Sequence, residues 1–82
     1  MRLPLYERVA LARDLEEYGL RKGDVAVLVD YVPHPYGGEE GYLLEVFNAL
    51  GESLTVIAVR ASDAEPMKAD EVLSVRHLAK AS

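Results

Sequence analysis

Residues 24–32 read DVAVLVDYV, and this stretch decides the fold class. It is rich in β-branched side chains, which favour extended backbone, and its length suits a single strand. Two prolines follow at Pro33 and Pro35, and proline cannot donate to a strand ladder. The strand is therefore expected to end there, and residues 33–41 (PHPYGGEEG) have the composition of a turn.

Two further strands are expected downstream of that turn. Residues 42–48 and 54–60 are apolar and rich in β-formers, and the tight turn NALGE at residues 48–52 joins them. Three strands joined in order by short turns predict an antiparallel meander.

The two ends of the chain are ambiguous from their residues alone. Residues 5–18 (LYERVALARDLEEY) have high helix propensity, with Gly19 placed to end a helix, yet Leu5, Val9 and Leu11 fit a period of two. Residues 70–80 (DEVLSVRHLAK) could form a helix capped by Asp70 or a short strand. A mainly β fold and an α+β fold, the latter a meander with N- and C-terminal helices, both stay open.

The composition indicates the number of domains, the cellular compartment and the kind of partner. Eighty-two residues make one domain, residues 1–82, and the absence of cysteine excludes disulfides, thiolate metal sites and thiol nucleophiles. No apolar run reaches the roughly 20 residues of a spanning helix, so we expect a cytoplasmic protein without membrane contact. Nine Lys and Arg against 14 Asp and Glu leave a net charge of −5, which suits a basic protein partner better than nucleic acid.

The stretch GLRKGD at residues 19–24 has the glycines of a phosphate-binding loop but not its spacing. Such loops run into a helix after a Gly-Lys-Ser/Thr or Gly-x-Gly-x-x-Gly pattern, whereas here an aspartate and a strand follow. Asp24 would repel a phosphate. We expect a turn in which Gly23 adopts positive φ and Asp24 bonds nearby amides.

No arrangement of residues indicates catalysis. The carboxylate pairs at residues 16–17, 39–40 and 70–71 are adjacent in the chain and suit solvated loops more than general acid–base work. His34 and His77 lack metal-ligand spacing, and no serine has a nucleophile-elbow context. We therefore expect no enzyme activity, no metal and no cofactor.

Several segments together resemble a family of small bacterial proteins of unknown function that are taken to be SH3-like barrels. The matching pieces are VAL at 9–11, DL at 14–15, GL at 19–20, KGDVA at 22–26, YLLEVF at 42–47, GE at 51–52 and DEVLSVR at 70–76. The central Gly-Leu-x-x-Gly-Asp-Val is also similar to KOW-type domains and to a barrel domain of the nitrile hydratase β subunit. The resemblance implies a small five-stranded SH3-like barrel with a long first loop over residues 14–23. It also implies strands at residues 9–13 and 72–77, the second of which closes the barrel.

The central strands carry apolar residues on both faces, and this feature leads to a function. We expect the core to take Val25, Val27, Val29, Tyr42, Leu44, Val46, Val56 and Ala58. The opposite face would then present Leu28, Val32, Leu43, Phe47, Ile57 and Val59, and a large exposed apolar patch usually marks an interface. Alternatively, the chain's own ends cover this face.

We expect a non-enzymatic protein-interaction module of antitoxin, immunity or accessory-subunit type, whose partner is a neighbouring gene's product or a second copy. Loop residue Tyr36 is expected to join Leu28, Leu43, Phe47, Ile57 and Val59 in this surface, because loops often carry function. The alternative is a KOW- or Sm-like nucleic-acid-binding barrel. It would stack bases on Tyr31, Tyr36, Tyr42 and Phe47 beside Arg60, Arg76 and His77.

Overall fold

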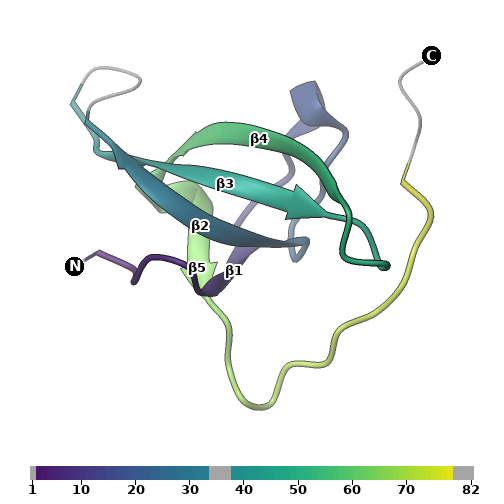
Figure 1. Cartoon of the computed structure of the whole chain (residues 1–82). Helices are drawn as coiled ribbons and strands as arrows, with labels where there is room; N and C mark the ends of the chain where they lie inside the picture. The colour runs from purple at the N-terminus through teal and green to yellow at the C-terminus, as the bar shows by residue number, and fades with distance from the viewer. Residues whose placement is uncertain (1, 34–37, 79–82) are drawn as a thin grey trace.

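The computed structural model describes residues 2–33 and 38–78 and shows a single sheet of five antiparallel strands (Figure 1). The strands lie in the order β4-β3-β2-β1-β5, and two single-turn 3-10 helices interrupt the loops. The elements are β1 (Arg8–Leu11), η1 (Glu16–Tyr18), β2 (Val25–Val32), β3 (Gly41–Phe47), β4 (Ser53–Arg60), η2 (Ala61–Asp63) and β5 (Ala64–Pro66). A mainly β fold with five strands and a long first loop is confirmed. The α+β alternative is wrong, because the described parts of both ends contain no α-helix.

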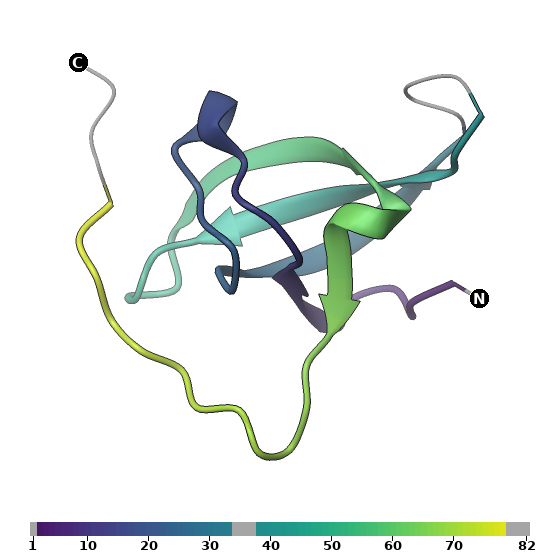
Figure 2. The same cartoon turned by 180° about the vertical axis from the view of Figure 1, so that it is seen from behind.

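The closing strand predicted at residues 72–77 is wrong, since the fifth strand is Ala64–Pro66. The chain turns back immediately after β4 through η2, and β5 pairs with β1 in the register Val9↔Pro66 and Leu11↔Ala64. Figure 2 shows β1 and β5 lying across the β2–β4 part of the sheet. The sheet does not close, because no ladder joins β4 to β5 among the described residues.

The core contains the inward side of β1–β4 together with two leucines of the first loop. Leu15 and Leu20 pair across that loop and are 1% and 5% exposed. The N-terminal segment covers part of the core: Leu3 and Leu5 pack against it, and the Tyr31 hydroxyl donates to the Leu3 carbonyl at 2.6 Å. The core cluster is Val9, Leu11, Leu15, Leu20, Ala26, Leu28, Tyr42, Leu44, Val46, Ile57 and Val59.

The predicted faces are correct for β3 and wrong for β2 and β4. Tyr42, Leu44 and Val46 point inward as expected, whereas Val25, Val27, Val29 and Ala58 are only half-buried and Val56 is 49% exposed. Both misassigned strands carry apolar residues on each side, so their own pattern does not determine which side faces the core. The ladders with β3 determine which side of β2 and β4 faces the core.

Two β-bulges mark where the ladders change register. In the β2–β3 pair, Leu28 lies opposite Leu44 and Asp30 opposite Leu43, so Val29 is an extra residue. The bulge lets both Leu28 and Tyr31 contribute to the inner side although they are three residues apart. A second irregularity in the β3–β4 pair follows Val46, where Phe47 pairs with Ser53.

Candidate interaction surface

The outward side of β2, β3 and β4 forms an apolar surface that we call the hairpin face. Its residues are set by the ladders, in which Val27, Glu45 and Val56 lie opposite one another and Leu43 lies opposite Ala58. Phe47 and Val56 are 37% and 49% exposed, and the others are half-buried. The hairpin face consists of Val27, Leu43, Glu45, Phe47, Val56 and Ala58.

Glu45 is the charged residue at the centre of this face. Its carboxylate accepts a hydrogen bond from the Ser53 hydroxyl at 2.7 Å, which orients the side chain along the sheet. Aliphatic side chains flank it on both neighbouring strands, and it is half-buried. A carboxylate in such surroundings is suited to receive an ammonium or guanidinium group that arrives within an apolar surface.

The turn after β3 extends the apolar surface beyond the strands. Asn48 organises it: its side-chain Oδ1 accepts from the backbone N–H groups of Leu50 and Glu52 at 3.0 and 2.9 Å. Gly51 takes φ 81°, a conformation that glycine adopts without strain. The result is a hydrogen-bonded turn that presents Leu50 84% exposed, and Leu54 in the following strand is 46% exposed.

The predicted interaction residues divide into three groups. Leu43 and Phe47 lie on the hairpin face as expected. Leu28, Ile57 and Val59 are only 0–2% exposed and fill the core, so their placement on an outer face is wrong. Tyr36 lies outside the described residues.

Val56, Leu54 and Leu50 were missed, and the reason for Val56 is the register of the ladder. Glu45 is the polar residue within β3 and therefore marks its outward side. Counting across the turn at residues 48–52 would place Thr55 opposite Glu45, whereas the irregularity after Val46 moves Val56 to that position.

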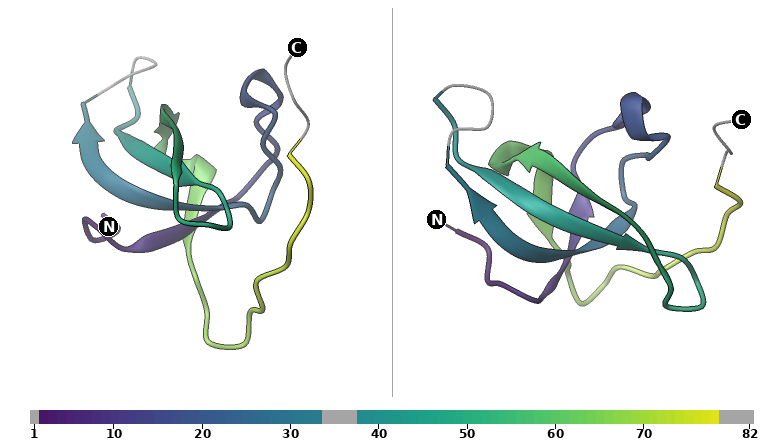
Figure 3. Two further views of the ribbon diagram at one scale, coloured as in Figure 1. Left: turned by 45° about the vertical axis from the view of Figure 1, so that its right-hand side comes forward. Right: turned by 45° about the horizontal axis from the view of Figure 1, so that its top comes forward.

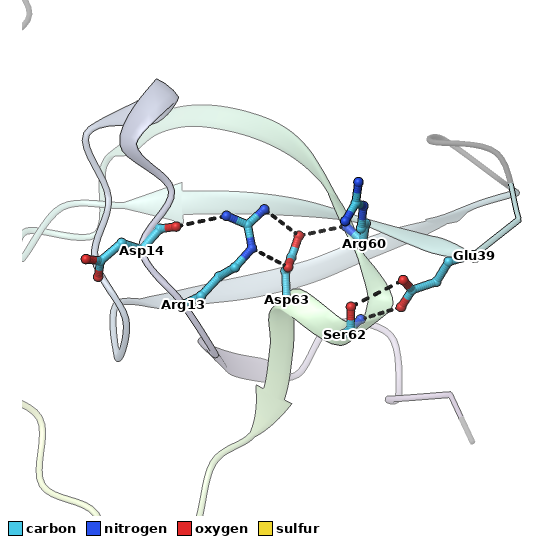
Figure 4. Close-up of polar contacts among 6 residues, drawn as sticks. All are labelled: Arg13, Asp14, Glu39, Arg60, Ser62 and Asp63. Carbon is cyan, nitrogen blue, oxygen red and sulfur yellow. Dashed lines mark hydrogen bonds and ion pairs between the residues drawn. The ribbon is translucent and has the colours of Figure 1, made fainter.

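A second cluster, of polar residues, ties the first loop to the turn after β4 (Figure 4). The guanidinium of Arg13 donates to both carboxylate oxygens of Asp63, at 2.7 and 3.3 Å. Asp63, which is 4% exposed, also accepts from the backbone N–H of Arg60 at 3.1 Å. Glu39 accepts from the backbone and hydroxyl of Ser62 at 2.8 and 3.2 Å. These contacts fix η2 and bring β5 onto β1, so the cluster acts on the fold.

The first loop contains the turn predicted at residues 19–24. Gly23 has φ 91°, and Asp24 accepts a hydrogen bond from the backbone N–H of Arg21 at 2.8 Å. Asp24 is also ion-paired with Arg76. Its carboxylate therefore organises the turn and holds a distant segment, in agreement with a structural role.

A third polar contact holds the N-terminal segment. Arg2 donates to both carboxylate oxygens of Glu40, at 3.0 and 2.6 Å, and its guanidinium lies 4.4 Å from the centre of the Tyr31 ring. The hydrogen bond that Arg2 donates to Glu40 raises the pKa of Arg2 above its ordinary value.

Two of the base-stacking residues of the nucleic-acid alternative, Tyr31 and Tyr42, pack inward, whereas Phe47 is exposed and Tyr36 lies outside the described residues. Tyr42 is 2% exposed, and its ring lies 5.9 Å from the half-buried ring of Tyr31. Arg76 is paired with Asp24. Within residues 2–33 and 38–78, no three His, Asp or Glu side chains gather as metal ligands would, and no helix has the length and hydropathy of a membrane span.

Comparison with known proteins places the chain in a family whose function is unknown. A family model described as a domain of unknown function, DUF4926, matches residues 5–66, which is most of the chain. Neither curated proteins nor solved structures gave a match. The expectation of a small family of unknown function is confirmed.

Proposed function

Because the chain belongs to the DUF4926 family, whose function is unknown, we propose from its surface that it is a non-enzymatic protein-interaction module. The hairpin face is the docking surface. The observation that carries this proposal is the exposure of Phe47 and Val56 on the hairpin face, where Val56 lies opposite Glu45, together with the exposure of Leu54 two residues before Val56 on β4. Contiguous exposed apolar residues on a small domain favour a role in binding.

The charges favour a basic protein as the partner. The chain has a net charge of −5, and the hairpin face places one carboxylate, Glu45, among aliphatic side chains. A partner that inserts a Lys or Arg surrounded by apolar residues would match both features, and the long-range charge would speed association. This chemistry suits an antitoxin, an immunity protein or an accessory subunit, acting in the cytoplasm on the product of a neighbouring gene.

An SH3-like barrel that stays open between β4 and β5 is the architecture that we propose for this module. The strand order β4-β3-β2-β1-β5, the long first loop and the 3-10 turn directly before the last strand support it. The resemblance noted in the sequence points to the same architecture. The hairpin face would then be the outer surface of the barrel wall.

The test is co-expression of the tagged chain with its neighbouring genes, followed by purification and light scattering. The critical variant is Val56→Lys, since this side chain is half-exposed and the substitution leaves the core intact. A lysine there should weaken binding about 30-fold, a loss of about 2 kcal/mol that is typical of an interface hot spot. The matched control is Tyr6→Asn, because Tyr6 is 75% exposed, has φ 64° and is not part of the hairpin face.

A stoichiometric complex with wild type and Tyr6→Asn that is lost with Val56→Lys would support the proposal. Equal recovery of the partner by Val56→Lys would refute the assignment of the hairpin face. Salt-dependent binding of a labelled oligonucleotide, with no protein partner, would instead favour the KOW- or Sm-like alternative.

A further inference from the structure

The segment after β5 leaves the sheet and runs along its outside without joining it (Figure 3). Residues 71–78 have no helix or strand, and their large apolar side chains are turned to solvent. Val72 and Val75 are 90% and 88% exposed, and Leu73 and Leu78 are 55% and 43% exposed. We call residues 70–77 of this segment the strap.

A local turn shapes the start of the strap, and an ion pair holds its end. At its start, the Glu71 carboxylate accepts from the backbone N–H of Lys68 at 2.6 Å, and the Glu71 N–H donates back to the Lys68 carbonyl at 3.1 Å. At its end, the Arg76 guanidinium is ion-paired with Asp24 on the turn before β2. The four residues between, Val72 to Val75, are thus tethered outside the sheet between this turn and the ion pair. Such tethering lowers the entropy cost of pairing with another strand.

The order of side chains along the strap makes it self-complementary. It begins with Asp70 and Glu71, continues with Val72, Leu73, Ser74 and Val75, and ends with Arg76 and His77. Two antiparallel copies would set the acidic end of each against the basic end of the other, with the apolar centres in contact. Two parallel copies would oppose like charges directly, which is destabilising in a ladder.

We propose that the strap pairs antiparallel with the strap of a second copy of this chain, about a two-fold axis near Leu73 and Ser74. In the register that sets Leu73 opposite its own copy, Val72 faces Ser74 and Asp70 faces Arg76 of the other chain, whose guanidinium would then bridge Asp70 and its own Asp24. Val72 and Val75 are β-branched, and β-branched residues favour strands. This strap dimer does not depend on the hairpin face. It would leave that face open for a different partner and give assemblies with two copies of each protein.

The groove beside the strap gives a second copy additional apolar surface. It has a volume of about 450 Å³ and lies between the N-terminal segment, the end of β5 and the strap. Leu3, Pro4, Val9, Pro66 and Leu73 contribute its apolar wall. A side chain from the opposing strap would lie next to this wall, which adds contacts that an isolated two-stranded ribbon lacks.

The absence of cysteine makes a disulfide test direct, since each introduced thiol is the only one in the chain. Four single variants are needed: Leu73→Cys, Ser74→Cys, Asp70→Cys and His77→Cys. Around a two-fold axis near 73 and 74, central thiols come within disulfide reach, whereas thiols at 70 and 77 lie roughly 20 and 27 Å from their copies. The expected result is oxidation to covalent dimers at least 10-fold faster at 73 or 74 than at 70 and 77. Phe47→Cys on the hairpin face is the control for association through the other surface.

Sedimentation equilibrium of the unmodified full chain, without any partner, completes the test. The proposal expects a reversible monomer–dimer equilibrium that Leu73→Asp shifts towards monomer at least 10-fold, because the new charges would oppose each other at the axis. Equal oxidation at all four strap positions, faster oxidation at Phe47→Cys, or a monomer at every concentration up to the millimolar range would overturn it. None of these outcomes alters the test of the hairpin face, which needs a second protein.

Discussion

Replacing Asp63 with alanine removes the acceptor that joins three parts of the chain. The carboxylate is 4% exposed and receives hydrogen bonds from Arg13 in the first loop and from the backbone N–H of Arg60 at the start of η2. Its own backbone carbonyl accepts from the Ala12 N–H at 2.7 Å and would remain. The substitution therefore removes the side-chain contacts and leaves the strand pairing in place.

The expected cost is about 2 kcal/mol of unfolding free energy. Loss of the acceptor for a helix-start N–H costs about 1 kcal/mol. The Arg13 side chain is 52% exposed, so its charge returns largely to water, and the lost ion pair adds only about 1 kcal/mol. A chain of this length has a total stability of about 4–12 kcal/mol, so the fold should survive. The midpoint of thermal unfolding should fall by roughly 8–16 °C.

Thermal and urea unfolding followed by circular dichroism measure this loss. Two control variants accompany this measurement. Asp63→Asn keeps one acceptor oxygen and should lose about half as much unfolding free energy as Asp63→Ala. Glu65→Ala, at an exposed position on β5, should stay within about 0.5 kcal/mol of wild type. A stability of Asp63→Ala within about 0.5 kcal/mol of wild type would refute the view that this cluster fixes the turn onto β5.

Three other results are expected. Leu44→Ala, at a core position with 0% exposure, should lower the free energy of unfolding by about 2–5 kcal/mol in urea melts, and a smaller loss would mean that the core repacks there. Gly51→Ala should cost about 1–2 kcal/mol because φ is 81° and its Cβ would meet no atom within 4 Å, so the cost is backbone strain; an unchanged midpoint would contradict this. The complex formed through the hairpin face should tighten as salt is lowered from 0.5 to about 0.05 M, as titration calorimetry would show, and a salt-independent affinity would argue against a basic partner.

Local patterns predict strands well and predict their partners poorly in this chain. Residues 24–32 identify β2 because branched side chains and terminal prolines leave no competing structure. The faces of β2 and β4 are not predictable from these strands alone, since both sides carry apolar residues and the bulge at Val29 changes the period within β2. The outward polar residue Glu45 fixed the face of β3 alone.

The position of the last strand depends on contacts that are distant in the sequence. Residues 72–77 have strand-like composition, yet β5 forms at Ala64–Pro66 because Asp63 is held by Arg13, fifty positions earlier in the chain. No local sequence pattern predicts an ion pair such as Arg13–Asp63 between residues so far apart in the chain. The strap therefore retains the side chains of a strand without a place in the sheet, which is the basis for pairing with a second copy.

Only part of the candidate surface could be predicted from the sequence, because the face of each strand depends on its ladder. Leu43 and Phe47 belong to β3, whose face the sequence indicates, and both lie on the hairpin face. Ile57 and Val59 belong to β4, whose face is decided by the ladder with β3, and both are buried. An apolar surface was correctly expected, but half of its members came from the wrong side of the sheet.

Hydroxyl-radical footprinting of the purified complex tests most directly whether the hairpin face is the interface. In the free protein Phe47, Leu54 and Val56 are 37%, 46% and 49% exposed and should be oxidised readily, as should Tyr6 at 75%. In the complex we predict that oxidation of Phe47, Leu54 and Val56 falls several-fold while that of Tyr6 is unchanged. Unaltered oxidation of those three residues, with protection appearing elsewhere on the chain, would contradict the account.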